Sequence, residues 1–341
     1  MEQAGDKQRA GPDDGQTARR KGPAAAAGDG PPSPKGKAKI SDPEVLAEFL
    51  LRPDPARPDL TERLRGLDQD GQETETLVVV ERPLTLYLNR QEIVTMMTIG
   101  DHPEYLAVGF LLNQNMLRPD DVITAIDYEE DLEVVVVRTE RETNYEEKLK
   151  KKVRTSGCAQ GTVFGDLMDK FAEIELDRNT RLHTSWLYEL TRKINGVPSL
   201  YLSAGAIHGC ALCLQDRPLI YVEDVGRHNA VDKIAGYMFL EGISPQDKIF
   251  YTTGRLTSEM VIKTVQMQVP ILVSRSGFTA WGVDLARQAG LTLIGRAKGR
   301  RFLALSGYER LVFDSRKDAE DARRDSDTQA RNANQGKGGD E

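Results

Sequence analysis

The stretch Tyr-Val-Glu-Asp-Val-Gly-Arg-His-Asn-Ala-Val-Asp-Lys, residues 221–233, decides the fold that we expect for this chain. It begins inside an apolar run, 218–222, that predicts a strand, and it ends inside the apolar periodicity of a helix over 229–240. The turn between them is densely charged, and a strand, such a turn and a helix are the place where α/β proteins keep their chemistry. A salt-bridged structural corner is the alternative, because turns are polar in any case. The functional candidates in this turn are Glu223, Asp224, Arg227 and His228.

On both sides of this stretch, short apolar strands alternate with amphipathic helices. This alternation is typical of an α/β layered domain with a mostly parallel or mixed sheet. The expected strands are 200–203, 218–222, 248–252, 271–274, 291–294 and 302–305, and the expected helices are 163–174, 185–194, 229–240, 258–268 and 280–289.

The chain divides into four parts by composition and pattern. A disordered or loosely ordered N-terminal tail is expected over 1–75, and a disordered C-terminal tail over 317–341, because both are polar and lack periodicity. A small α+β unit is expected over 76–150, and the α/β domain with the cysteine loop and a cofactor site over 151–316. Within the small unit we expect strands at 77–80, 84–88, 93–98 and 134–137 and a helix at 103–116.

Composition excludes several classes of protein. The formal net charge of -7 argues against a nucleic-acid-binding protein but allows a local basic pocket. No apolar run approaches the roughly 18 residues that a membrane span needs, and the N-terminus lacks the apolar core of a signal peptide. We therefore expect a cytoplasmic protein with no membrane partner. Three cysteines in 341 residues are too few for a disulfide framework.

Cys158 lies in a loop of small residues, Thr155 to Thr162, between the basic run 148–154 and a predicted helix. Neighbouring positive charge and a helix N-terminus both lower a thiol pKa, which favours the nucleophilic thiolate. The alternative is an incidental exposed cysteine.

His208, Cys210 and Cys213 have residue types that bind zinc. The pattern also has some likeness to the zinc deaminases, but the residue two after His208 is Cys210 rather than Glu. Small residues packed at a strand end are therefore the favoured interpretation.

Two further groups follow predicted strands and open predicted helices, where backbone N–H groups and a guanidinium can bind an anion. N-cap roles alone would explain Ser258 and Thr279 but not the arginines. The groups are Thr253, Gly254, Arg255, Ser258, Glu259 and Lys263, and then Ser274, Arg275, Ser276 and Thr279.

The segment 296–301 places four cations within six residues after an apolar strand. Such a density suits a multiply charged ligand such as a nucleotide diphosphate, and a solvated basic hairpin is the alternative.

Taken together, these segments resemble the FdhD family of formate dehydrogenase accessory sulfurtransferases over most of residues 77–314. The resemblance is carried by Glu223 to Lys233, by Gly254-Arg255 with Ser258, Glu259 and Lys263, by Ser274 with Thr279, and by Leu291 to Gly295.

This resemblance implies a persulfide carrier with a fold that resembles cytidine deaminase. A loop cysteine, here Cys158, would accept sulfur from a cysteine desulfurase and deliver it to bis-molybdopterin guanine dinucleotide molybdenum cofactor before insertion into formate dehydrogenase. Many members have Cys-x-x-Cys in this loop, whereas the second position here is Gly161. A single thiol can still hold the transferable sulfur as a persulfide. The family's cofactor-binding stretch corresponds to Arg296, Ala297, Lys298, Gly299, Arg300 and Arg301.

We therefore expect a homodimeric sulfurtransferase that carries molybdenum cofactor as cargo, binds GDP as its mimic and has no metal site of its own. A non-catalytic chaperone that shelters the cofactor and docks it to a dehydrogenase is the first alternative. The second is a zinc hydrolase using His208, Cys210 and Cys213.

Overall fold

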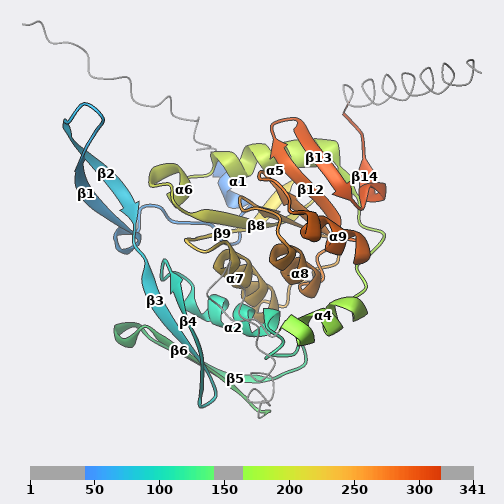
Figure 1. Ribbon diagram of the computed structural model, residues 1–341, viewed down its shortest axis with the longest axis horizontal. Helices are drawn as coiled ribbons and strands as arrows, with labels where there is room; N and C mark the ends of the chain where they lie inside the picture. The colour runs from blue at the N-terminus through green and yellow to red at the C-terminus, as the bar shows by residue number, and fades with distance from the viewer. Residues whose placement is uncertain (1–42, 142–163, 316–341) are drawn as a thin grey trace, which may run out of the picture. The chain divides into compact units, whose positions relative to one another are not determined.

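A six-stranded mixed sheet dominates the computed structural model, which describes residues 43–141 and 164–315 (Figure 1). Its strands are β8 (His208–Leu214), β9 (Arg217–Asp224), β10 (Lys248–Thr252), β11 (Ile271–Ser274), β12 (Thr292–Lys298) and β13 (Arg301–Ser306). They have the order β13-β12-β11-β10-β8-β9, with β8 and β13 antiparallel to their neighbours. Strands β9 to β12 run in one direction, so their carboxyl ends meet at the same edge of the sheet.

Helices cover both faces of this sheet, and a separate apolar core lies under each set. Helix α5 (Thr184–Gly196) illustrates how the apolar side of a helix packs on the sheet, because Leu187, Leu190 and Ile194 recur at helical spacing and all are buried. The prediction of a mixed α/β fold is therefore confirmed. One face carries α4 (Phe164–Glu173), α7 (Arg227–Leu240), α8 (Ser258–Gln266) and α9 (Ala280–Gln288), and the other carries α1 (Pro43–Ala47) and α5 (Thr184–Gly196) (Figure 1).

A second, four-stranded sheet has the order β4-β3-β6-β5 and packs against α2 (Pro103–Asn113). Helix α2 is apolar on all sides because it also packs against α7. Two glycines make this crossing close: a Cβ atom at Gly109 would lie 1.7 Å from the carbonyl oxygen of Asp232, and one at Gly236 would lie 1.9 Å from that of Tyr105. The strands are β3 (Arg82–Leu88), β4 (Gln91–Thr98), β5 (Ile123–Glu129) and β6 (Val134–Thr139).

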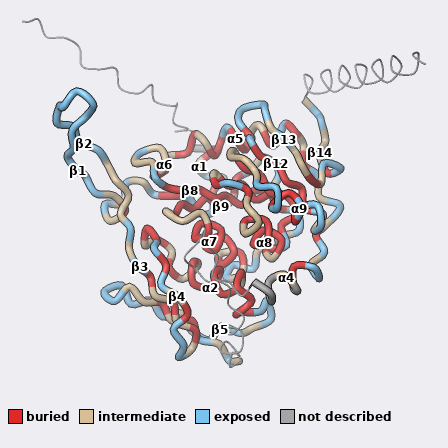
Figure 2. The backbone as a smooth tube through the Cα atoms, in the orientation of Figure 1, coloured by how far each residue is buried: buried red, intermediate tan, exposed pale blue. Residues whose placement is uncertain are grey.

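Two short pairs complete the described structure. β1 (Thr61–Leu67) and β2 (Glu73–Val79) form an antiparallel ribbon that is mostly exposed (Figure 2). β7 (Leu182–His183) pairs in parallel with β14 (Leu311–Val312). Single 3-10 turns precede β1, β6 and β14 at Pro58–Leu60, Glu130–Leu132 and Tyr308–Arg310.

The structure corrects the sequence-based prediction in several places. Residues 200–203, predicted as a strand, form the helix α6 (Leu200–Ser203), because Ser199 and a buried carboxylate bind its first N–H groups. The inner strand β8 was predicted only as a strand end, and β1 and β5 were not predicted. Loosely ordered chain was expected up to residue 75, but buried Val45, Phe49 and Leu60 anchor part of it.

The boundaries of the four predicted parts stay predictions, and both tails lie largely outside the described residues. Within the described residues no helix is long and apolar enough to cross a membrane.

Candidate functional site

The loops that follow β10 and β11 form one connected layer at the carboxyl edge of the large sheet, and the last residues of β12 are bonded to it. Leu256 N donates to Gly277 O at 2.9 Å, and Thr279 N donates back to Leu256 O at 3.0 Å. Arg296 N donates to Ser276 O at 2.7 Å, which joins β12 to the same layer. This edge is where ligands bind in open α/β sheets.

Four arginines project from this edge, and none forms an ion pair with a carboxylate in the described part of the chain. Arg255 and Arg296 are exposed, whereas Arg227 and Arg275 are half-buried. The stem of Arg227 lies against Gly254, where a Cβ atom would be 3.2 Å from Arg227 Cβ. Its Nε atom is buried without a hydrogen-bond partner among the described residues. Unpaired guanidinium groups at one edge are suited to a phosphate or pyrophosphate.

The predicted cofactor-binding segment forms the hairpin between β12 and β13. Gly299 turns the chain with φ 61°, which glycine adopts without strain. The guanidinium carbon of Arg300 lies 5.4 Å from the centroid of the Tyr188 ring. Ala297 differs from its neighbours, because its side chain is buried in the sheet core. The residues exposed for a ligand are Arg296, Lys298, Gly299, Arg300 and Arg301.

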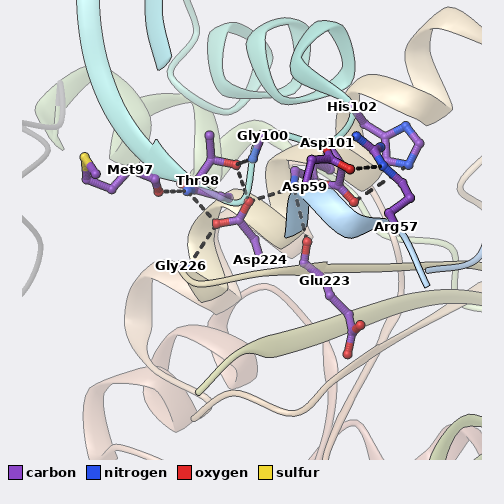
Figure 3. A network of polar contacts seen from close by, with 12 residues as sticks. Arg57, Asp59, Met97, Thr98, Gly100, Asp101, His102, Glu223, Asp224 and Gly226 are labelled. Carbon is purple, nitrogen blue, oxygen red and sulfur yellow. Dashed lines mark hydrogen bonds and ion pairs between the residues drawn. The ribbon is translucent and has the colours of Figure 1, made fainter. Parts of the chain in front are cut away.

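Asp224 in the charged turn is fully used by the fold (Figure 3). One oxygen accepts hydrogen bonds from Gly226 N at 3.0 Å and Asn229 Nδ2 at 2.9 Å. The other accepts from Thr98 Oγ1 at 2.5 Å and contacts Lys233 Nζ at 2.7 Å. No lone pair remains for a ligand, so Asp224 is a structural residue that joins the two sheets.

Glu223 is also buried, with 1 % of its surface exposed. Its carboxylate accepts from Leu200 N at 2.7 Å and from Tyr201 N at 3.1 Å. Burial raises the pKa of Glu223 to about 7, although these two hydrogen bonds oppose the shift. The Glu223 carboxylate therefore caps the N-terminus of α6.

His228 and Glu259 form a pair beside the arginines, with Nε2 and Oε2 2.9 Å apart. Burial lowers the pKa of His228, against the opposing effect of Glu259. His208 is half-buried nearby, and burial followed by the charge of Arg227 lowers its pKa as well. Burial thus favours the neutral form of both imidazoles, whereas the guanidinium groups of the edge are always charged.

Three of the remaining anion-binding candidates, Lys263, Ser274 and Thr279, are occupied within the fold. Lys263 Nζ contacts both carboxylate oxygens of Asp232, at 2.7 and 2.8 Å. Ser274 Oγ donates to Gly254 O at 2.6 Å. Thr279 caps α9 by accepting from Gly282 N at 3.2 Å, as the sequence suggested. Sequence reasoning identified the arginines but missed the side chains that hold two of them, which are Tyr188, Asn195 and Tyr201.

Cys210 and Cys213 lie in β8 and point to opposite faces of the sheet, since each belongs to a different apolar core. They cannot ligate one metal ion, so the zinc-hydrolase alternative is wrong. Burial raises the pKa of the Cys210 thiol to about 12 and that of Cys213 further. Neither thiol is accessible or ionised. Cys158, the predicted nucleophile, lies outside the described residues and stays a prediction.

A cavity of about 600 Å³ lies beside Gly290, just before β12, and so at the amino edge of the sheet. Arg310 borders it but is buried, and its guanidinium donates to the carbonyl oxygens of Gly290 and Asp177. The four arginines of the carboxyl edge therefore do not line this cavity.

Comparison with known proteins gives consistent matches over this fold. The FdhD/NarQ family matches residues 79–312. The "Sulfur carrier protein FdhD" of Listeria innocua is 30% identical over 244 residues, covering 71% of this chain and 94% of the relative. Its namesake from Wolinella succinogenes is 31% identical over 237 residues, covering 67% and 80%. A crystal structure described as a candidate formate dehydrogenase accessory protein from Desulfotalea psychrophila superposes with a TM-score of 0.60 at 26% identity, covering 74% of this chain and 98% of that chain.

Proposed function

Since the chain belongs to the FdhD/NarQ family, we propose that it is a sulfur carrier that serves a formate dehydrogenase. The observation that carries this proposal is the position of the cysteines. A sulfur carrier needs an accessible thiol of low pKa, and Cys210 and Cys213 are buried with raised pKa values. Cys158 is the remaining cysteine of the sequence, and it follows a cationic run.

The sulfur chemistry requires one thiolate and one electron-donating acceptor. The Cys158 thiolate attacks the terminal sulfur of a cysteine desulfurase persulfide, forms a new S–S bond and releases the desulfurase thiolate. Delivery breaks that S–S bond and returns Cys158 to the thiolate. Conversion of the transferred sulfur to sulfide needs two electrons, and Gly161 excludes a second loop thiol as their source. The two electrons would therefore come from the metal centre that accepts the sulfur, and this centre would be oxidised by two electrons.

The acceptor that fits the carboxyl edge is molybdenum cofactor in its bis-molybdopterin guanine dinucleotide form. Each of its nucleotides contains a pyrophosphate, which matches the unpaired arginines and the exposed cations Arg296, Lys298, Arg300 and Arg301. We expect Gly299 to allow close approach and Ala297 to contribute through its backbone only. GDP should bind as a mimic of one nucleotide.

Further parts of the proposal come from the family resemblance alone. They are a homodimer, a cytoplasmic location and a relation of the layered sheet to the cytidine-deaminase fold.

Labelling with radioactive sulfur tests the proposal. Full-length protein is incubated with a cysteine desulfurase and labelled cysteine, and sulfane sulfur on the chain is quantified. We expect label on wild type and on the Cys210→Ala/Cys213→Ala double variant, and none on Cys158→Ala. Equal labelling of wild type and Cys158→Ala would overturn the assignment of Cys158. Absence of label from wild type that still binds GDP would favour the non-catalytic cofactor chaperone instead.

A further inference from the structure

Arg275 is the most closely held of the arginines at the carboxyl edge. Its guanidinium carbon lies 5.3 Å from the centroid of the Tyr201 ring, and Nη1 donates to Asn195 Oδ1 at 3.2 Å. Neither contact neutralises its charge, because a ring face and an amide oxygen are both uncharged. Both contacts restrict its orientation, and the half-buried Arg275 keeps part of its surface exposed.

Tyr201 is itself held by an unusual helix. The four-residue α6 is too short to be stable through its own hydrogen bonds. Three of its N-terminal N–H groups have side-chain partners, because Glu223 accepts from Leu200 and Tyr201 and the Ser199 hydroxyl accepts from Leu202 at 3.4 Å. The buried Glu223 carboxylate thus fixes the backbone that carries the ring.

These contacts form one chain from the core to the surface. Glu223 is the penultimate residue of β9 and is buried, and its carboxylate fixes α6. The Tyr201 ring on α6 in turn faces Arg275, which follows β11 at the edge of the sheet. Lys233 contacts the carbonyl oxygen of Glu223 at 3.1 Å, which ties the same strand end to α7.

We propose that Tyr201 is a positioning residue for ligand binding: anchored by Glu223, its ring fixes the Arg275 guanidinium in the orientation that receives the diphosphate of a guanine nucleotide. This inference rests on the proposed function, because it deepens the binding site named there. A guanidinium already ordered in the free protein loses less conformational freedom when a phosphate binds. The ring also leaves the charge available, which a carboxylate partner in the same place would not.

Calorimetric titration of GDP into the full-length chain tests the proposal. We expect Tyr201→Leu to weaken GDP binding about 5- to 10-fold, on the order of a partly desolvated cation–π contact. Tyr201→Phe keeps the ring face and should bind like wild type. Arg178→Ala removes an exposed arginine beside the cavity at the opposite edge and should also leave the affinity unchanged.

A double-mutant cycle separates positioning from general damage. If the ring acts through the guanidinium, Tyr201→Leu has no further effect on GDP affinity in an Arg275→Ala background. Additive losses, or equal losses in Tyr201→Phe and Tyr201→Leu, would overturn the positioning role. Absence of GDP binding by wild type would contradict the proposed function itself, so the two failures are distinguishable.

Discussion

Lys233 Nζ lies 2.7 Å from Asp224 Oδ2, and neither side chain has any exposed surface. The same ammonium contacts Asp101 and the carbonyl oxygen of Glu223. One buried cation on α7 therefore compensates two carboxylates, one at the end of β9 and one in the segment before α2. Figure 3 shows Asp101 and Asp224 on these two segments of the chain. The charged stretch 221–233 thus holds the two sheets together, and this explains its density of polar groups.

Lys233→Met should destabilise the protein by about 3–5 kcal/mol, because it leaves Asp101 and Asp224 buried without a counter-charge. Urea unfolding measures the change. Arg138→Met is the matched control, since its ion pair with Asp127 is half-exposed and should contribute less than about 1 kcal/mol. Equal losses in the two variants would show that burial of the Lys233 network has no special importance.

Gly109→Ala should cost about 3 kcal/mol or prevent folding. The new methyl group would lie 1.7 Å from the Asp232 carbonyl oxygen, so α2 and α7 must move apart and disturb both cores. Gly66→Ala on the exposed ribbon is the control, because no atom lies within 4 Å of its added Cβ. Thermal unfolding of both variants is the measurement, and a stable Gly109→Ala protein would contradict the close helix crossing.

Glu223 should make stability pH-dependent in an unusual direction. Its folded pKa of about 7 is above the ordinary 4.5, so the folded state binds more protons than the unfolded state between these values. The associated stability is fully present below about pH 4.5 and is lost as pH rises through 7. Relative to Glu223→Gln, wild type should lose about 3 kcal/mol from pH 4.5 to 8, measured by urea unfolding. Parallel pH profiles for the two proteins would show that the Glu223 pKa is not raised.

The sequence predicted the alternating strands and helices of the large sheet well, because their apolar periodicity is strong and local. The prediction was wrong at α6, because the pattern Leu-Tyr-Leu is typical of a strand. The helix forms there because of the Glu223 carboxylate, which is more than 20 residues away in sequence. It also missed β8, whose Cys-x-x-Cys drew attention to metal chemistry while the strand period places the two thiols on opposite faces.

Only part of the candidate site was predicted, because some of its residues follow strongly periodic strands whereas others depend on contacts that are distant in sequence. Arg255, Arg275 and the segment 296–301 could be selected because they follow predicted strands whose carboxyl ends meet. The carboxylates of Glu223 and Asp224 could not be separated from catalytic ones, since a buried partner such as Lys233 or Thr98 is invisible in local sequence. Tyr201 and Asn195 carry no motif at all, and only their position beside Arg275 identifies them.

Charge reversal in the β12–β13 hairpin tests where the phosphates of the cargo bind. Arg300→Glu/Arg301→Glu should weaken GDP binding by at least about tenfold, because two exposed cations beside the proposed pyrophosphate site become anions. Arg178→Glu/Arg217→Glu is the control, since it makes the same change in net charge at exposed positions away from the carboxyl edge. Calorimetry at low and high salt should show the loss in the first variant only, and the difference should shrink as salt screens it. Equal weakening in both variants would mean that GDP responds to overall charge, and unchanged affinity in both would place its phosphates elsewhere.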